Sequence, residues 1–185
     1  MLFSRKQKDP KKEKEFEIVD MIEELEWNPV KRWSKRSVGS IDRVIIHHTG
    51  SKGDVTSINK YHISPGNHIS SLGTPHICYH YVISGPFTSN HCDGEIVLVN
   101  DIRDITWHCR GQNSRSIGIA VVGNFVDDTK PSSEQLLAVR WLMKHIHEDL
   151  GIDKKEFYGH CDFRKPACPG KSLYNEIMLF KNNTI

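Results

Sequence analysis

The pattern of apolar and polar positions predicts one α/β unit from about residue 43 onward. Its first segment, 43–48, is a β-branched run that ends at Thr49-Gly50, and this pattern predicts a buried strand with two histidines at its end. The expected elements are strands at 43–48, 78–84, 95–100 and 117–123, and helices at 56–62, 133–150 and 173–180. A loop rich in Ser, Gly, Pro and His follows the first helix, and its length suggests a function.

The expected helix at 133–150 has the clearest pattern. Ser132 and Gln135 form a capping box, an apolar stripe continues to Leu150, and Gly151 ends the helix. A helix with one apolar face has to bury that face, so we expect this helix to pack across the sheet. The fold class that follows is α/β.

The first 40 residues differ in composition from the rest of the chain. Residues 1–14 are rich in lysine and offer little apolar surface, so we expect them to be disordered. In residues 15–27, apolar side chains recur at helical spacing among acidic ones, which predicts an amphipathic helix that ends at Asn28-Pro29. With the basic segment that follows, this gives an N-terminal helical extension at 1–40 and a main domain at 41–185.

Length, charge and cysteine content limit the class of protein. A chain of 185 residues can form one domain with its own core, and a net charge of +2 gives no basic excess for nucleic-acid binding. No apolar run is long enough for a transmembrane segment and the charged start does not fit a signal peptide, so we expect cytoplasmic synthesis. Five cysteines without obvious pairing favour a metal or free thiols over a disulfide scaffold.

The segment 159–170 is the first candidate for chemistry. It places His160 eight residues before Cys168, in a loop whose Pro and Gly residues can bring both side chains to one point. A catalytic zinc ion takes three His, Cys or carboxylate ligands and leaves one position open. His47 is the best candidate for the third ligand because it ends a strand. On spacing alone, two unrelated side chains explain the segment equally well.

Five motifs occur in one order along the chain. They are IIHHT at 45–49, YHYVI at 79–83, Trp107-His108, NSRSIGI at 113–119 with VGN at 122–124, and GH at 159–160 through CPG at 168–170. Together they resemble the type 2 N-acetylmuramoyl-L-alanine amidases, a family that includes lytic amidases of bacteriophages and the peptidoglycan-recognition proteins. The resemblance covers about residues 43–180 and makes the 41–185 region a zinc amidase catalytic domain.

The resemblance implies a central mixed sheet with helices on both faces and a glycopeptide groove over a zinc ion. The ligands that it implies are His47, His160 and Cys168, and the last two are the pair that the spacing suggested. Relatives that only bind peptidoglycan lose ligands of this set, whereas this chain keeps all three. An enzyme is therefore favoured over a binding module.

The resemblance also implies catalytic roles beside the metal. Tyr79 matches a tyrosine that assists proton transfer, and His108 matches a residue that binds the substrate or polarises its carbonyl. Pro166 stands where relatives place a Lys or Thr that stabilises the oxyanion, so either Lys165 or His108 is expected to provide that stabilisation. Ala120 replaces a glutamate of some relatives, which fits the tyrosine-type branch.

Two further residues are expected on the substrate side of the site. Adjacent strand residues point to opposite faces, so His47 and His48 do not both face the metal. His48 is then a neighbour that packs, forms hydrogen bonds or contacts substrate. Asn113 is expected to bind substrate.

The expected function is zinc-dependent hydrolysis of the amide bond between N-acetylmuramic acid and L-alanine in peptidoglycan. The expected setting is that of a monomeric phage-type endolysin, which reaches the cell wall through a separate membrane pore. Three alternatives stay open: a non-catalytic or regulatory peptidoglycan-recognition module, a protein-interaction role of residues 1–40, and a virion-associated enzyme. Zinc is the preferred ion, although another divalent ion fits the same ligands.

Overall fold

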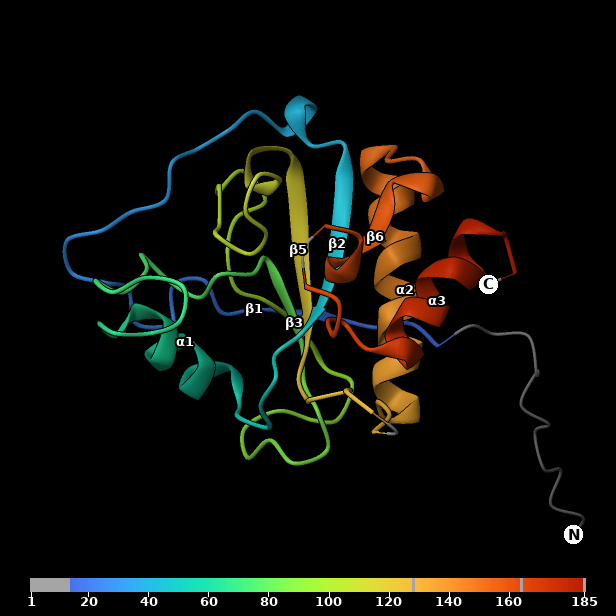
Figure 1. Cartoon of the computed structure of the whole chain (residues 1–185), viewed down its shortest axis with the longest axis horizontal. Helices are drawn as coiled ribbons and strands as arrows, with labels where there is room; N and C mark the ends of the chain where they lie inside the picture. Colours follow the sequence, from blue (N-terminus) through green and yellow to red (C-terminus); the bar gives the residue numbers. More distant parts are fainter. Residues whose placement is uncertain (1–13, 128, 164, 185) are drawn as a thin grey trace, which may run out of the picture.

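The computed structural model describes residues 14–127, 129–163 and 165–184. A six-stranded sheet in the order β1-β4-β3-β5-β2-β6 forms its centre (Figure 1). Strands β3 and β4 are antiparallel, and the other neighbouring pairs are parallel. The strands are β1 (Ile18–Asp20), β2 (Arg43–His48), β3 (Tyr81–Ile83), β4 (Ile96–Leu98), β5 (Ser116–Val121) and β6 (Phe157–Gly159).

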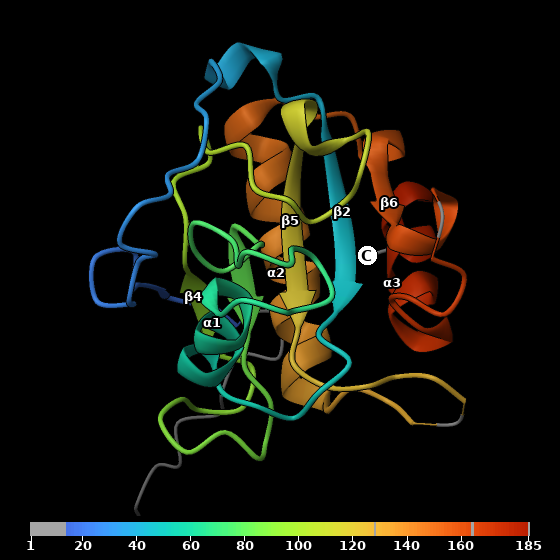
Figure 2. The same cartoon turned by 60° about the vertical axis from the view of Figure 1, so that its left-hand side comes forward.

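Helices cover both faces of the sheet, with α1 on one face and α2 and α3 on the other (Figures 1 and 2). The helices are α1 (Val55–Ile63), α2 (Ser133–Leu150) and α3 (Lys171–Lys181), and short 3-10 turns lie at Val38–Ser40, Asn113–Arg115, Lys154–Glu156 and His160–Asp162. The expected α/β class with a mixed sheet between helices is confirmed. Strands β3 and β4 are shorter than expected, and β1 and β6 lie where the pattern predicts no strand.

The face under α2 and α3 is a continuous apolar core. Side chains of β2 and β5 alternate between the two faces of the sheet, and one set of them points into this core. That set is Val44, Ile46, Ile117, Ile119 and Val121, all fully buried. The rings of Phe157 and Phe180 pack together with centroids 4.9 Å apart, and this contact joins β6 to α3.

Helix α2 begins and ends where its sequence predicts. The Ser132 hydroxyl accepts a hydrogen bond from the Gln135 N–H at 3.0 Å, and the Gln135 side chain accepts one from the Ser132 N–H at 3.1 Å. Gly151 ends the helix with φ of 66°, a left-handed conformation that glycine adopts without steric cost. The predicted capping box and the stop at Gly151 are both confirmed.

The predicted N-terminal helix is wrong in the described residues. Ile18–Asp20 instead forms β1, which pairs in parallel with β4, and the Met21 N–H continues this pairing to the Leu98 carbonyl at 3.0 Å. Asp20 then accepts a hydrogen bond from the Ile22 N–H and starts a turn. Leu25 is buried in the core beneath α1. Pairing with the sheet therefore overrides the helical spacing.

The disordered lysine-rich tail expected at 1–14 falls mostly on residues 1–13, which lie outside the described residues. Lys14 is described, and it forms an ion pair with Glu134 of α2. The division of the chain at residue 40 stays a prediction. Within the described ranges, no helix combines the length and apolar character that crossing a bilayer requires.

Candidate metal centre

Strand β2 places His47 on the face opposite the apolar core. Ile46 points towards α2, so its neighbour His47 points to the α1 side, where it is 1% exposed. The partner of His47 in β5 is Ala120, whose small side chain leaves room for the imidazole. His47 is therefore a buried, rigidly held side chain at the end of a central strand.

The other two residues of the site come from the segment after β6. Gly159 pairs with Ile46 of β2, which puts His160 directly beside the end of β2. A Cβ at Gly159 would lie 2.8 Å from the Tyr174 ring, so the chain passes α3 more closely there than another residue allows. Cys168 returns to the same point, and its sulfur accepts a hydrogen bond from the His48 N–H at 3.4 Å.

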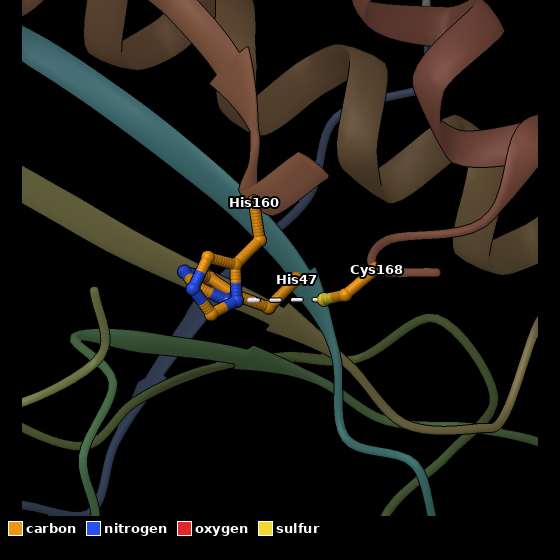
Figure 3. Close-up of side chains that lie close together, drawn as sticks. All are labelled: His47, His160 and Cys168. Carbon is orange, nitrogen blue, oxygen red and sulfur yellow. Dashed lines mark hydrogen bonds between the residues drawn. The ribbon is translucent and has the colours of Figure 1, made fainter. Parts of the chain in front are cut away.

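The three side chains converge on one point (Figure 3). The Nδ1 atoms of His47 and His160 are 3.0 Å apart, and Cys168 Sγ is 4.0 Å from His47 Nδ1. All three ligand atoms lie within 4.8 Å of one another. Tetrahedral zinc, with bonds of about 2.05 Å to nitrogen and about 2.3 Å to sulfur, needs separations of about 3.3 Å and about 3.6 Å. Side-chain shifts of at most about 1.2 Å bring this group into that geometry, so the His-His-Cys group is compatible with zinc.

Burial sets the charge state of the group. It lowers the pKa of His47 well below its ordinary value, with contributions from His108 and His160. Burial, helped by Lys165, also lowers the pKa of His160 to about 4. Both imidazoles are therefore neutral near pH 7. Burial raises the pKa of the Cys168 thiol to about 12, so a thiolate at this position needs a bound cation.

The group opens onto a cleft of about 580 Å³. Tyr79 and Trp107 line one part of it, and the exposed cations Arg110 and Lys165 lie at its rim. The loop after α1, whose length suggested a function, borders the cleft through His68 and Ile69. Such a cleft admits an extended polar molecule. It also leaves the nitrogen and sulfur atoms of the His-His-Cys group accessible from one side.

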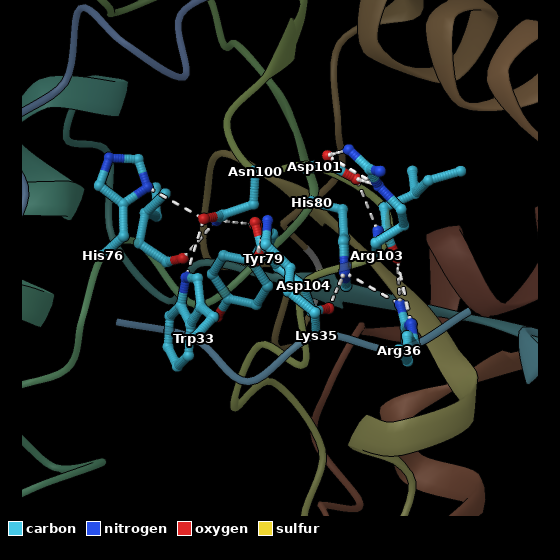
Figure 4. Close-up of polar contacts among 12 residues, drawn as sticks. Trp33, Lys35, Arg36, His76, Tyr79, His80, Asn100, Asp101, Arg103 and Asp104 are labelled. Carbon is cyan, nitrogen blue, oxygen red and sulfur yellow. Dashed lines mark hydrogen bonds and ion pairs between the residues drawn. The ribbon is translucent and has the colours of Figure 1, made fainter. Parts of the chain in front are cut away.

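Tyr79 lies against the His-His-Cys group, with its ring centroid 5.3 Å from that of His47. Burial raises the pKa of its phenol far above the ordinary value, so Tyr79 stays protonated and can donate a hydrogen bond. Asn100 fixes the backbone around it, since its amide donates to the carbonyls of Ile77 and Tyr79 at 2.7 and 2.6 Å (Figure 4). The Asn100 side-chain oxygen in turn accepts from the Trp33 indole at 2.8 Å.

His108 lies beside His47 and also lines the cleft. Its Nδ1 is 3.1 Å from His47 Nε2, and its Nε2 is 3.0 Å from the Ser116 hydroxyl. Both ring nitrogens therefore have partners within the protein, and the side chain is only 6% exposed. This arrangement favours a supporting role over the predicted contact with a substrate carbonyl.

The remaining predicted residues differ in their surroundings. Lys165 is exposed at the cleft, next to Pro166, and fits the predicted place for a charge-stabilising group. His48 is half-buried at the cleft and accepts a hydrogen bond from the Phe125 N–H at 3.1 Å. Asn113 does not line the cleft, because its side chain accepts from the Cys109 N–H at 2.7 Å and organises that loop. Substrate binding by Asn113 stays a prediction that no contact supports.

Sequence reasoning assigned no role to Trp33, Asn100 or Ser116, although all three hold the site in place. Trp33 packs edge-on against Trp107 of the cleft, with centroids 5.5 Å apart. A polar residue at the end of a predicted strand, as in Val99-Asn100, is the signal that could have drawn attention to Asn100. No local pattern indicates Trp33, which lies 67 positions before its hydrogen-bond partner.

The fold and the site together define a class of protein, an α/β domain with a zinc-compatible His-His-Cys group that opens onto a cleft at the end of a central strand. Residues 37–171 match the family Amidase_2, described as N-acetylmuramoyl-L-alanine amidase, and the chain belongs to this family. Peptidoglycan-recognition protein SC2 of Drosophila simulans is 27% identical over 168 residues, which cover 89% of this chain and 88% of that protein.

Solved structures share the fold. Peptidoglycan recognition protein-LE in complex with tracheal cytotoxin, a monomeric diaminopimelic acid-type peptidoglycan, has a TM-score of 0.69 at 23% identity and covers 87% of this chain and 92% of its own. The N-acetylmuramoyl-L-alanine amidase LysC from Clostridium intestinale URNW has a TM-score of 0.64 at 23% identity and covers 90% and 97%.

Proposed function

We propose that this protein is a zinc-dependent N-acetylmuramoyl-L-alanine amidase, which hydrolyses the bond between N-acetylmuramic acid and L-alanine in peptidoglycan. The observation that carries the proposal is the complete set of His47, His160 and Cys168 beside Tyr79 in an open cleft. Membership of the amidase family supports the same reaction. Zinc held by these residues would polarise a carbonyl and lower the pKa of a bound water to about 7.

The protein's own residues have distinct roles in this reaction. Tyr79, protonated at neutral pH, donates a hydrogen bond to the reacting carbonyl and assists proton transfer to the leaving amine. Lys165 at the cleft rim stabilises the negative charge that develops on the carbonyl oxygen. Water and the amide are consumed, and a lactyl carboxylic acid and the free amino group of L-alanine are formed.

The cleft rim supports a peptidoglycan substrate. Arg110 and Lys165 are cations at the edge of the cleft, where they complement the carboxylates of a peptide stem. Trp107 is 43% exposed there and offers an apolar surface to a sugar or peptide. The structure of the similar peptidoglycan recognition protein-LE contains a bound monomeric peptidoglycan. This is consistent with a peptidoglycan ligand for the present cleft.

Product analysis of digested peptidoglycan tests the proposal. Zinc-loaded protein is incubated with purified peptidoglycan beside a chelated sample, and new chemical ends are identified by mass spectrometry. Free L-alanine amino groups without new reducing sugars are expected only with zinc. New reducing ends would indicate a glycosidase, and binding without cleavage would favour the recognition module, which the similarity to recognition proteins also supports.

Two variants connect the reaction to the site. Cys168→Ser should lose zinc and activity together, whereas Cys161→Ser, a half-buried neighbour outside the group, should keep both. Tyr79→Phe should keep zinc and lose turnover by about 10²-fold or more, because only its proton-donating group is removed. Full zinc occupancy in Cys168→Ser would contradict the assigned ligands.

A lytic setting belongs to the same proposal but needs its own test. We propose that the protein acts as an endolysin, made in the cytoplasm and released to the wall through a separate membrane pore. Bacteria that express it should remain intact until their membrane is permeabilised, and then lyse. Lysis without permeabilisation would contradict this setting and leave the amidase reaction unaffected.

A further inference from the structure

A chain of hydrogen bonds leads from His47 away from the cleft and into the protein. His47 Nε2 is 3.1 Å from His108 Nδ1, and His108 Nε2 is 3.0 Å from the Ser116 hydroxyl. The Ser116 hydroxyl is 2.8 Å from the Gln112 carbonyl oxygen. His47, His108 and Ser116 are 1%, 6% and 0% exposed, so water can replace few of these hydrogen bonds.

The last group in this chain gives the hydrogen bonds one direction. A carbonyl oxygen can only accept, so Ser116 donates its single hydroxyl hydrogen to Gln112. The Ser116 oxygen must then accept from His108 Nε2–H. A neutral imidazole carries one N–H, so His108 Nδ1 is unprotonated and accepts from His47 Nε2–H. His47 Nδ1 is thereby the unprotonated nitrogen, and it is the atom that faces His160 and Cys168.

Packing against β5 holds the intermediate ring in place. A Cβ at Gly118 would lie 2.6 Å from His108 Cγ and 2.8 Å from its Nδ1, so the ring rests directly on the strand backbone. The His47 and His108 rings meet edge to face, at an interplanar angle of 85°. His108 lines the cleft, and a rotation of its ring would break the contacts with His47 and Ser116.

We propose that His108 and Ser116 are positioning residues that fix the tautomer of His47 and present its Nδ1 to the metal. The proposal rests on the proposed function only in requiring that a metal binds to the His-His-Cys group. Partners of this kind behind a ligand histidine change metal affinity by about 10–100-fold. In the metal-free protein, the 3.0 Å contact between His47 Nδ1 and His160 Nδ1 then places a proton on His160.

Imidazole nitrogen chemical shifts test the tautomers in the unaltered protein. Long-range ¹H–¹⁵N correlation spectra of the full chain, recorded near pH 7 with a chelator present, should show His47 and His108 protonated at Nε2. His160 should be protonated at Nδ1. A His47 protonated at Nδ1, or one that exchanges freely between tautomers, would overturn the proposal without any variant being needed.

Zinc affinity tests the consequence of the tautomer. Ser116→Ala should bind zinc about 10–100-fold more weakly in competition with a chelator. Ser114→Ala is the matched control, because Ser114 is exposed two residues earlier and should leave the affinity unchanged. Unfolding curves in chelator establish that both variants are folded. Unchanged zinc affinity in folded Ser116→Ala would contradict the proposal.

Neither measurement uses peptidoglycan, so the two proposals can fail separately. A protein without amidase activity that still shows the His47 and His108 tautomers would retain the positioning role. An active amidase whose His47 is protonated at Nδ1 would lose the positioning role and retain its proposed function.

Discussion

Ile46 and His47 are neighbours in β2, yet their environments differ completely. Ile46 faces a core of aliphatic and aromatic side chains under α2 and α3. His47 faces His108, His160 and Tyr79 on the α1 side. In β2, the alternation of a strand thus points Ile46 into the core under α2 and α3 and His47 into the site, which lies beside a second, smaller apolar core on the α1 side.

The two faces also satisfy their buried atoms by different means. The apolar face needs only close packing, which is not directional. On the α1 side, Asn100 is fully buried and its amide serves two backbone carbonyls, the Trp33 indole and the His76 ring (Figure 4). A polar face of this kind tolerates few substitutions, because a lost partner leaves a buried group unsatisfied.

Phe157→Ala should have the largest effect, and it should affect the apolar face alone. Phe157 is fully buried and packs on Phe180, so the cavity should lower the free energy of unfolding by about 3–5 kcal/mol. Urea unfolding measures this loss. Zinc affinity of the folded variant should not change, because Phe157 does not line the cleft. A loss of zinc affinity in folded protein would show that the two faces are coupled.

Lowering the pH should have the next largest effect on the free energy of unfolding, and it should act through His62 on the α1 side. Burial lowers the pKa of His62 from 6.5 to about 4, so the unfolded state binds a proton between these pH values and the folded state does not. The contribution of His62 is therefore complete above pH 6.5 and is lost as pH falls towards 4, by about 3 kcal/mol.

Urea unfolding of the chelated protein across this pH range measures the acid effect without interference from metal release. His62→Gln is the matched variant, because an amide oxygen can accept the hydrogen bond that the Cys78 N–H gives to His62. Its stability should depend less on pH than that of the unaltered protein. An equal pH dependence in both proteins would place the sensitivity on other groups, such as His80, whose pKa is lowered to about 3 mainly by burial.

The apolar face could be predicted from the sequence because its signals are local. The apolar stripe and capping box predict α2, and the β-branched run predicts β2. Each signal lies within a short segment of sequence, and the structure confirms both elements. The segment 15–27 shows the limit of such signals. Its helical spacing is real, but pairing of Ile18–Asp20 with β4 depends on residues about 78 positions away, which the local pattern does not contain.

The polar face could be predicted only in part. The motifs around His47, His160 and Cys168 marked the candidate metal ligands, and the structure brings these residues together. The supporting contacts were out of reach because they join distant segments, such as His47 with His108 across 61 positions. Direction of hydrogen bonding, which separates a positioning role of His108 from a substrate contact, exists only in the folded protein.

Trp33→Phe tests the α1 side of the sheet, and it should lower the free energy of unfolding by less than the two changes above. The change keeps an aromatic ring but removes the indole hydrogen bond to Asn100, so the free energy of unfolding should fall by about 1–1.5 kcal/mol. Trp27→Phe is the control, because the Trp27 indole bonds to the Ile22 carbonyl and Trp27 does not line the cleft. Weaker peptidoglycan binding in Trp33→Phe alone would show that residues before the family match support the cleft wall.

Ser132→Ala should have the smallest effect on stability, and it should act on the apolar face through α2. The hydroxyl of Ser132 caps α2 and also donates to Asp93 at 2.8 Å, so its removal should lower the free energy of unfolding by about 1 kcal/mol. The exposed Ser133 provides the control, and Ser133→Ala should have almost no effect. Thermal unfolding measures both, and zinc affinity should be the same in the two variants. If Ser132→Ala changed the zinc affinity, a change at the start of α2 would reach the site through the apolar face. The roles of the two faces would then not be separate.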